Sequence, residues 1–178
     1  MCSSVRLIET ERLNIRCLQV GDAEFIVELL NEPDWIKYID DRGVRTVDDA
    51  QNYIVNGPMQ MYREHGIGLL LVELKGNGVP IGVCGLIQRD FLKDVDLGFG
   101  FLSKYYGSGY AYEAAHATMK YGVEELGFRR IAGFTSLNNE KSMRLLRKLG
   151  MKDEGNIRYS TSAEYVRLFA KEFNLEKE

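Results

Sequence analysis

The sequence is poor in the residues that mark several common classes of protein. Its three cysteines form no Cys-x-x-Cys pair, and His65 and His116 have no partner at metal-binding or triad spacing. Neither a zinc site nor a histidine-based catalytic centre is therefore indicated. No apolar run approaches the ~20 residues that a membrane span needs, and the first residues lack the basic start and apolar core of a signal peptide. These absences predict a cytoplasmic protein that binds neither a metal nor a membrane.

An excess of positive charge is also lacking. Lys and Arg number 23 against 26 Asp and Glu, which gives a formal net charge of -3. Nucleic-acid binding needs clustered Lys and Arg against the phosphates, so no nucleic-acid partner is expected. A cationic binding partner remains compatible with this balance. The 178 residues contain only three prolines and show no repeat or linker, which predicts a single domain over 1–178.

Hydrophobic periodicity predicts a mixed α/β domain (mixed α+β) with antiparallel hairpins around one central strand–helix–strand unit. Asp22 is expected to cap the first helix. Thr46 and Asp49 have capping-box spacing before the second helix, which Gly57-Pro58 should end. Further helices are expected at about 109–126 and 139–149. Strands are expected at 13–18, 68–74, 81–87, 95–102, 130–135, 151–157 and 165–173.

The strand at 95–102 has an unusual pattern of glycines. Asp96, Gly98 and Gly100 alternate with larger apolar residues and should share one face of the strand. Glycines inside a strand weaken it and often mark a close approach by another backbone or a ligand. An extended ligand that contains amides, such as pantetheine, would be able to bond there as an extra strand does.

A second glycine motif, Gly107-Ser108-Gly109, directly precedes the long helix. The start of a helix offers unpaired N–H groups and a positive dipole end, which suit a pyrophosphate. Glycines allow the loop backbone to approach the phosphate oxygens. The alternative is an ordinary tight turn. A P-loop would require a following Gly-Lys-Ser/Thr, and a dinucleotide fingerprint would require a small residue at Tyr112, so neither of these motifs fits.

Three segments, in order along nearly the whole chain, resemble the GNAT superfamily of N-acetyltransferases. Lys104-Tyr105-Tyr106-Gly107-Ser108-Gly109-Tyr110-Ala111 is similar to the family's Q/R-x-x-G-x-G/A loop. The run from Asn139 and Ser142 to Lys148-Leu149-Gly150-Met151 is similar to its N-x-x-S-x-x-L-x-x-K-L-G-F segment. The opening Thr10-Glu11-Arg12-Leu13-x-x-Arg16 resembles the start of the RimJ/RimL branch.

The resemblance implies a GNAT fold, with a mostly antiparallel twisted sheet of about seven strands, flanking helices and a central β-α-β unit that binds CoA. It also implies direct transfer of the acetyl group of acetyl-CoA to a primary amine, on a protein N-terminus or a small molecule. Lys104 stands where the family usually has Gln or Arg and keeps a donor. The residues expected to bind the cosubstrate are Phe99, Gly100, Phe101, Leu102, Lys104, Gly107, Ser108, Gly109, Tyr110, Ala111 and Asn139.

Catalysis needs a group that takes the proton of the incoming ammonium, and Asp96 is the first choice. The alternative for Asp96 is a solvated or turn-capping carboxylate, and Glu164 is a second, weaker choice for the base. A backbone N–H of the Phe99–Phe101 segment is expected to polarise the thioester carbonyl. The resemblance to the RimJ/RimL branch implies that Ser142 protonates or hydrogen-bonds the thiolate, and the alternative is an ordinary polar residue on a helix. Leu146 stands where many relatives carry a tyrosine acid.

Several charged residues near these motifs are open to two interpretations. Arg144, Arg147 and Lys148 are expected to share one side of their helix, where they either reach CoA phosphates or simply complement the helix dipole. Asn139 either bonds the pantetheine or only caps the helix. The acceptor site is expected between the N-terminal helices and the last strands. Acids and aromatics there would suit an ammonium, or they form a solvated, capping surface: Asp34, Asp40, Asp41, Asp48, Asp49, Trp35 and Tyr38.

Two other classes of function are compatible with the same scaffold. The chain would be a catalytically silent acetyl-CoA sensor if the missing tyrosine acid has no replacement. It would be an interaction module if only the fold is kept, although the intact Gly107-Ser108-Gly109 loop argues against that. A homodimer is possible in either case. The sequence itself does not choose the amine acceptor.

Overall fold

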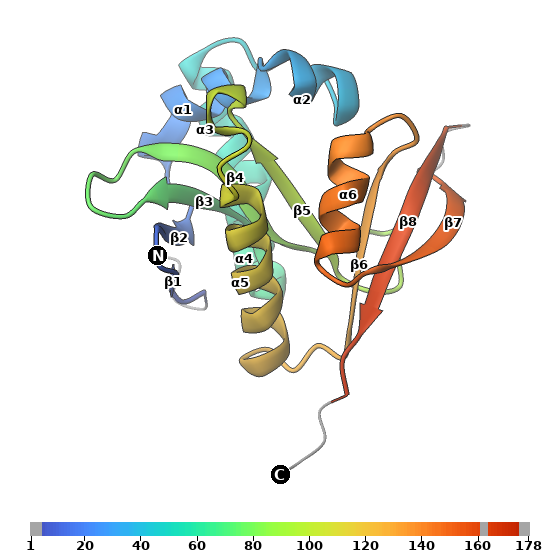
Figure 1. Ribbon diagram of the computed structural model, residues 1–178. Coiled ribbons are helices and arrows are strands. Elements are labelled where there is room, and N and C mark those ends of the chain that lie inside the picture. Colours follow the sequence, from blue (N-terminus) through green and yellow to red (C-terminus); the bar gives the residue numbers. More distant parts are fainter. Residues whose placement is uncertain (1–4, 161–163, 175–178) are drawn as a thin grey trace.

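The computed structural model describes residues 5–160 and 164–174 (Figure 1). In these ranges an eight-stranded open sheet has the order β1-β2-β3-β4-β5-β6-β8-β7. Every neighbouring pair is antiparallel except β5 and β6, which are parallel. The strands are β1 Ile8–Glu9, β2 Leu13–Cys17, β3 Gly68–Leu74, β4 Pro80–Ile87, β5 Asp96–Phe101, β6 Arg130–Ser136, β7 Lys152–Arg158 and β8 Tyr165–Glu172.

The helices cover both faces of the sheet. In Figure 1, α5 and α6 lie in front of the strands, and α3 lies behind them. One apolar core joins α5 and α6 to the sheet, and a second joins α1 and α3 to it through Leu71 and Val83. The helices are α1 Ala23–Leu30, α2 Pro33–Tyr38, α3 Val47–Asn56, α4 Pro58–His65, α5 Tyr110–Glu124 and α6 Glu140–Lys148, with short 3-10 turns η1 Val20–Asp22 and η2 Ser103–Tyr105.

The predicted mixed architecture and its central β-α-β unit are confirmed, with three additions. The described residues hold eight strands instead of about seven, because the two-residue β1 extends the sheet. Helices α2 and α4 were not expected, since six and eight residues are too short to show a clear 3.6-residue period. Pro58 ends α3 as predicted, but it then opens α4, a position where its missing N–H is harmless.

The two predicted helix caps turned out differently. Thr46 and Asp49 form the expected capping box, with each side chain accepting from the other's backbone N–H. Asp22 is the N-cap residue of α1, but its side chain makes no capping bond. It accepts two hydrogen bonds from Arg16 at 2.9 Å and one from the backbone N–H of Gln19 at 2.8 Å. Competition from the Arg16 guanidinium therefore redirects the Asp22 carboxylate.

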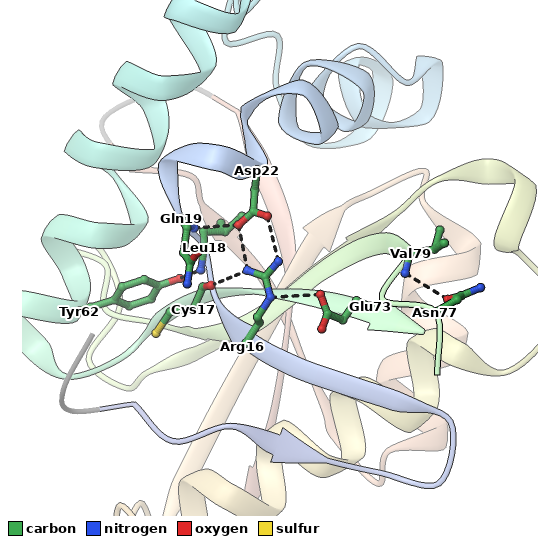
Figure 2. A network of polar contacts seen from close by, with 9 residues as sticks. All are labelled: Arg16, Cys17, Leu18, Gln19, Asp22, Tyr62, Glu73, Asn77 and Val79. Carbon is green, nitrogen blue, oxygen red and sulfur yellow. Dashed lines mark hydrogen bonds and ion pairs between the residues drawn. The ribbon is translucent and has the colours of Figure 1, made fainter. Parts of the chain in front are cut away.

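Arg16, from the opening motif, connects the segment before α1 to the sheet (Figure 2). Its guanidinium binds Asp22 and also donates to Glu73 on β3 at 3.1 Å. The neighbouring Leu18 N–H donates to the Tyr62 hydroxyl of α4 at 3.1 Å. Together these contacts fix η1, β2, β3 and α4 relative to one another, so the role of Arg16 is structural. No helix of the described part is both long and apolar enough to cross a membrane.

Candidate functional site

Strand β5 has one closed edge and one open edge. Towards β4 it is paired at every residue from Asp96 to Phe101, but towards β6 only Asp96 and Ala132 are partners. The Leu102 N–H donates to Ile81 on the β4 side, and the Val95 carbonyl accepts from Ala132 on the β6 side. Because these groups alternate along a strand, the N–H and C=O of Phe99 and Phe101 face the open edge. Among the described residues no strand pairs with that part of β5.

A cavity of about 670 Å³ borders the open edge. Its walls come from β5, the glycine loop and first turn of α5, the exposed side of α6, helix α2, and the ends of β6, β7 and β8. This size is within the usual range for a small-molecule site. The cavity brings together most of the residues that the sequence singled out: Asp96, Phe99, Gly100, Phe101, Gly107, Gly109, Tyr110, Ala111, Asn139 and Ser142.

Three predicted cosubstrate-binding residues do not border the cavity. Leu102 is buried in the core under α1 and α3, and its N–H is already bonded to Ile81. The Lys104 ammonium lies 3.0 Å from Glu28 in an exposed ion pair. The carbonyl of Ser108 accepts from Arg12 at 2.9 Å.

The glycine loop has the backbone geometry that its sequence suggested. Gly107 and Gly109 have φ values of +80° and +82°, which L-residues with side chains rarely adopt. A side chain at Gly107 would meet nothing within 4 Å, so its surface is open. Helix α5 begins at Tyr110, and the N–H groups of its first turn have no partner within the helix. This loop is therefore able to accept an anionic group at the cavity wall.

A clamp that sequence reasoning missed holds this loop in place. The Arg12 guanidinium bonds Glu113 at 2.7 Å and the Ser108 carbonyl at 2.9 Å, and it stacks on the Tyr110 ring at 4.4 Å. Glu113 also accepts from the Thr10 hydroxyl at 2.6 Å and from the Arg12 N–H at 2.9 Å. Burial alone would raise the pKa of Glu113, but these hydrogen bonds outweigh it and hold the pKa below its usual value. The Thr10–Arg12 motif was the available signal.

The Asp96 carboxylate borders the cavity. It is 1% exposed, so the solvated alternative does not hold. Burial raises the pKa of Asp96 to about 6, against the opposing charge of Arg89. The Arg89 Nε donates to Asp96 Oδ1 at 2.8 Å. A carboxylate with this pKa is mostly ionised at neutral pH and is still a usable proton acceptor.

Arg89 and its aromatic neighbours were not foreseen from the sequence. The guanidinium lies 4.9 Å from the Phe134 ring centre. Phe134 packs edge-on with Phe91 at 5.3 Å, and both rings contact Tyr159. These residues come from the β4–β5 loop, β6 and the end of β7. No sequence pattern links them, because only the folded sheet brings them together.

The predictions for α6 are partly confirmed. The Asn139 side chain accepts from the Ser142 N–H at 3.2 Å, so Asn139 caps the helix. Arg144 and Lys148 border the cavity, but Arg147 is directed towards Asp153 at 3.9 Å. Positions 144, 147 and 148 are neighbours on one side of the helix, but the contact with Asp153 separates the Arg147 side chain from the two cations that border the cavity. Leu146 is fully buried in the core and does not border the cavity.

The glycines of β5 accommodate side chains of the protein itself. A β-carbon on Gly100 would lie 2.4 Å from the Trp35 ring, and one on Gly98 would lie 2.7 Å from Ile87. Trp35 belongs to α2 and is 7% exposed. The group that closely approaches Gly100 is thus the Trp35 indole of α2. This contact holds α2 beside the open edge of β5.

The acidic residues near α2 and α3 are mostly engaged already. Asp40 pairs with Arg42 at 2.9 Å, Asp41 with Arg45 at 2.8 Å, and Asp34 with Lys141 at 3.8 Å. Asp49 belongs to the capping box, and neither it nor Asp41 or Asp48 borders the cavity. The capping and surface interpretation therefore holds for Asp41, Asp48 and Asp49. Among the described residues, no group of three or more potential ligands is placed to hold a metal ion.

Comparison with known proteins assigns the chain to the acyltransferases. The model of the acetyltransferase (GNAT) domain family matches residues 12–152. The protein belongs to that family of N-acetyltransferases, which confirms the resemblance seen in the sequence motifs.

Relatives and solved structures agree with the assignment. The uncharacterized protein YkkB of Bacillus subtilis is 30% identical over 152 residues, which cover 84% of this chain and 87% of YkkB. An acetyltransferase of the GNAT family from Bacillus anthracis has a TM-score of 0.77 at 30% identity, covering 94% of this chain and 98% of that one. RimL, a ribosomal L7/L12 α-N-protein acetyltransferase in complex with coenzyme A, has a TM-score of 0.82 over 96% of this chain and 100% of its own. At 14% identity it shows the fold alone.

Proposed function

We propose that the protein transfers the acetyl group of acetyl-CoA directly to a primary amine. The observation that carries the proposal is the placement of three features on one cavity: the open edge of β5, the glycine loop at the start of α5, and the buried Asp96 carboxylate. The RimL complex supports it, since a protein of the same fold holds coenzyme A.

The cosubstrate is expected to lie along β5 and end at α5. The Phe99 and Phe101 backbone groups bond the amides of the pantetheine arm, as a neighbouring strand would. The pyrophosphate lies against the N–H groups of Gly107, Gly109 and the first turn of α5, where the helix dipole favours negative charge. The Arg12–Glu113 clamp keeps these N–H groups in place without occupying them.

The chemistry then needs three contributions from the chain. Asp96 accepts the proton of the ammonium, directly or through water, so that the free amine attacks the thioester carbon. A β5 N–H of the Phe99–Phe101 segment stabilises the oxyanion that forms. When the C–S bond breaks, the Ser142 hydroxyl hydrogen-bonds the departing thiolate. That thiolate takes up the second proton, which the attacking nitrogen loses as it becomes an amide, and leaves as free CoA. Among the described residues the Ser142 hydroxyl has no hydrogen-bond partner, so it is available for this role.

Two measurements test the proposal. Release of free thiol from acetyl-CoA should require an amine, and mass spectrometry should find the acetyl group on that amine after incubation with labelled acetyl-CoA and a cell extract. Calorimetry with CoA supplies the second measurement. Binding of CoA without any acetylated product would indicate a sensor, and absence of CoA binding would indicate that only the scaffold is kept.

A further inference from the structure

Arg89 is fixed in the acceptor side of the cavity with most of its donors unused. Its Nε bonds Asp96, and the flat face of the guanidinium lies over Phe134. Its two terminal nitrogens, Nη1 and Nη2, have no hydrogen-bond partner among the described residues. The side chain is only 26% exposed and borders the cavity. A cation held in this way presents a rigid pair of donors in a region of reduced solvation.

A second guanidinium lies on the same side. Arg42 follows α2, borders the cavity and bonds Asp40 through its Nε at 2.9 Å. Within the described ranges its terminal nitrogens also lack partners. Burial raises the pKa of Tyr53, which borders the cavity as well, and the positive charges of Arg42 and Arg89 oppose that rise. Arg42, Arg89 and Tyr53 thus all border the same cavity.

The chemistry of this pair favours an anion. A guanidinium fork matches the two oxygens of a carboxylate, and such charge-assisted bonds are among the strong hydrogen bonds in proteins. The Arg89 side chain is only partly exposed, and a bound oxyanion would give its free donors charged partners. The Asp96 carboxylate, bonded to the same Arg89, lies where the amine must lose its proton.

We propose that the acceptor carries a carboxylate or a comparable oxyanion close to its amine, bound by the free terminal nitrogens of Arg89 and by Arg42. This inference rests on the proposed acetyl transfer and specifies its substrate class. The carboxylate has two chemical sources, a free amino acid and an acidic residue next to a peptide N-terminus. Both place an anion within a few bonds of the reacting nitrogen.

Matched acceptors test the inference and separate the two sources. One arm compares a panel of free amino acids with their C-terminal amides, which keep the amine and remove the charge. The other compares peptides that differ only by Asp or Asn at the second residue. In at least one arm, kcat/KM should be higher for the charged acceptor by about tenfold or more, the scale expected for losing a charged partner in a partly buried pair. The arm that shows the preference identifies the source.

Variants connect the preference to the two arginines. Arg89→Lys keeps the charge beside Asp96 but removes the fork, and Arg42→Met removes the second guanidinium. Both should lower the charged-to-neutral ratio, mainly through KM of the acceptor, while the affinity for CoA stays unchanged. Arg45→Met is the matched control, because Arg45 pairs with Asp41 and does not border the cavity. The ratio should be unaffected in that variant.

The possible failures are distinguishable. Equal rates with charged and neutral acceptors would overturn the inference and leave acetyl transfer intact. A preference that survives in both arginine variants would show that other residues bind the anion and would also overturn it. Absence of any acetylated acceptor, with CoA still bound, would refute the proposed function and the inference with it.

Discussion

The two sides of the cavity differ in how far the protein satisfies its own charged groups. Beside the glycine loop, the Arg12 guanidinium contacts Glu113, Ser108 and the Tyr110 ring, all from the protein itself. On the acceptor side, the Arg89 guanidinium has a single hydrogen-bond partner in the described part of the chain, and burial raises the Asp96 pKa to about 6. In the proposed mode of binding, the cosubstrate side is built before any ligand arrives, whereas the acceptor side is completed by its ligand.

This difference explains which hydrogen-bond donors remain free to bind a ligand on each side of the cavity. On the cosubstrate side, Arg12 makes its contacts within the protein and holds the glycine loop in place. The free donors there are backbone N–H groups, which do not depend on side-chain identity. On the acceptor side the free donors are the side-chain nitrogens of Arg89 and Arg42. Substitutions on the two sides test this difference, from the largest expected effect to the smallest.

The largest effect is expected from Asp96→Asn, which keeps the shape of the side chain and removes the base. The rate should fall by about 10²–10⁴, while the affinity for CoA changes little, because backbone groups hold the cosubstrate. The control is CoA binding by calorimetry on the same preparation. A rate within a few-fold of wild type would exclude Asp96 as the base and would favour Glu164, which also borders the cavity.

The pH dependence provides an independent check on Asp96. Since burial raises its pKa to about 6, the carboxylate is ionised and active above that pH, and it becomes protonated as the pH falls through about 6. The kcat/KM of the wild type should therefore decline on the acid side of pH 6. In Asp96→Asn the additional decline below about pH 6 should be missing, and the defect should shrink as the pH rises, because more of the amine is already deprotonated. An identical acid limb in both proteins would assign the titration to another group.

The second largest effect is expected from Gly109→Val, which tests the glycine loop. At φ +82° a β-branched residue is strained, by about 1–3 kcal/mol, and it would block the approach of a phosphate. The affinity for CoA should fall by roughly tenfold or more, the loss expected for removing about 1.4 kcal/mol of binding energy. Gly76→Val is the matched control, since Gly76 has φ +99° in the β3–β4 turn, away from the cavity. A folded Gly109→Val protein with normal CoA affinity would exclude pyrophosphate binding at this loop.

A smaller effect is expected from Arg12→Met, which removes the clamp and leaves the sequence of the glycine loop unchanged. The affinity for CoA should weaken by about two- to tenfold, the modest net effect expected of a hydrogen bond, because the first turn of α5 loses its orientation. Glu113→Gln should give a similar change, and the double variant should not add the two effects. Arg6→Met is the control, since Arg6 forms an exposed ion pair with Glu125 at 3.6 Å. Additive losses would show that Arg12 and Glu113 act separately.

Most of the sheet could be predicted from the sequence because its signals are local. Alternation and apolar runs located β3, β4 and β6 to within a few residues, and the capping box at Thr46 marked the start of α3. The glycine loop was predictable for the same reason, since a helix must start after it. What the sequence did not show are contacts between distant segments. Arg89, Phe134 and Asp96 meet only because β5 and β6 are neighbours, and α2 is too short to have a detectable period.

The smallest effect is expected from Lys104→Ala, which tests where the cosubstrate side ends. Lys104 was expected to bind a phosphate, but its ammonium pairs with Glu28 and does not border the cavity. Solvent and salt screen an exposed ion pair, so both stability and CoA affinity should change little, by less than about fivefold for the latter. Calorimetry at two salt concentrations provides the measurement. A loss larger than that of Arg12→Met would show that Lys104 leaves Glu28 and reaches the phosphates when CoA binds. The cosubstrate side would then also be completed by its ligand, and the difference between the two sides would be one of degree.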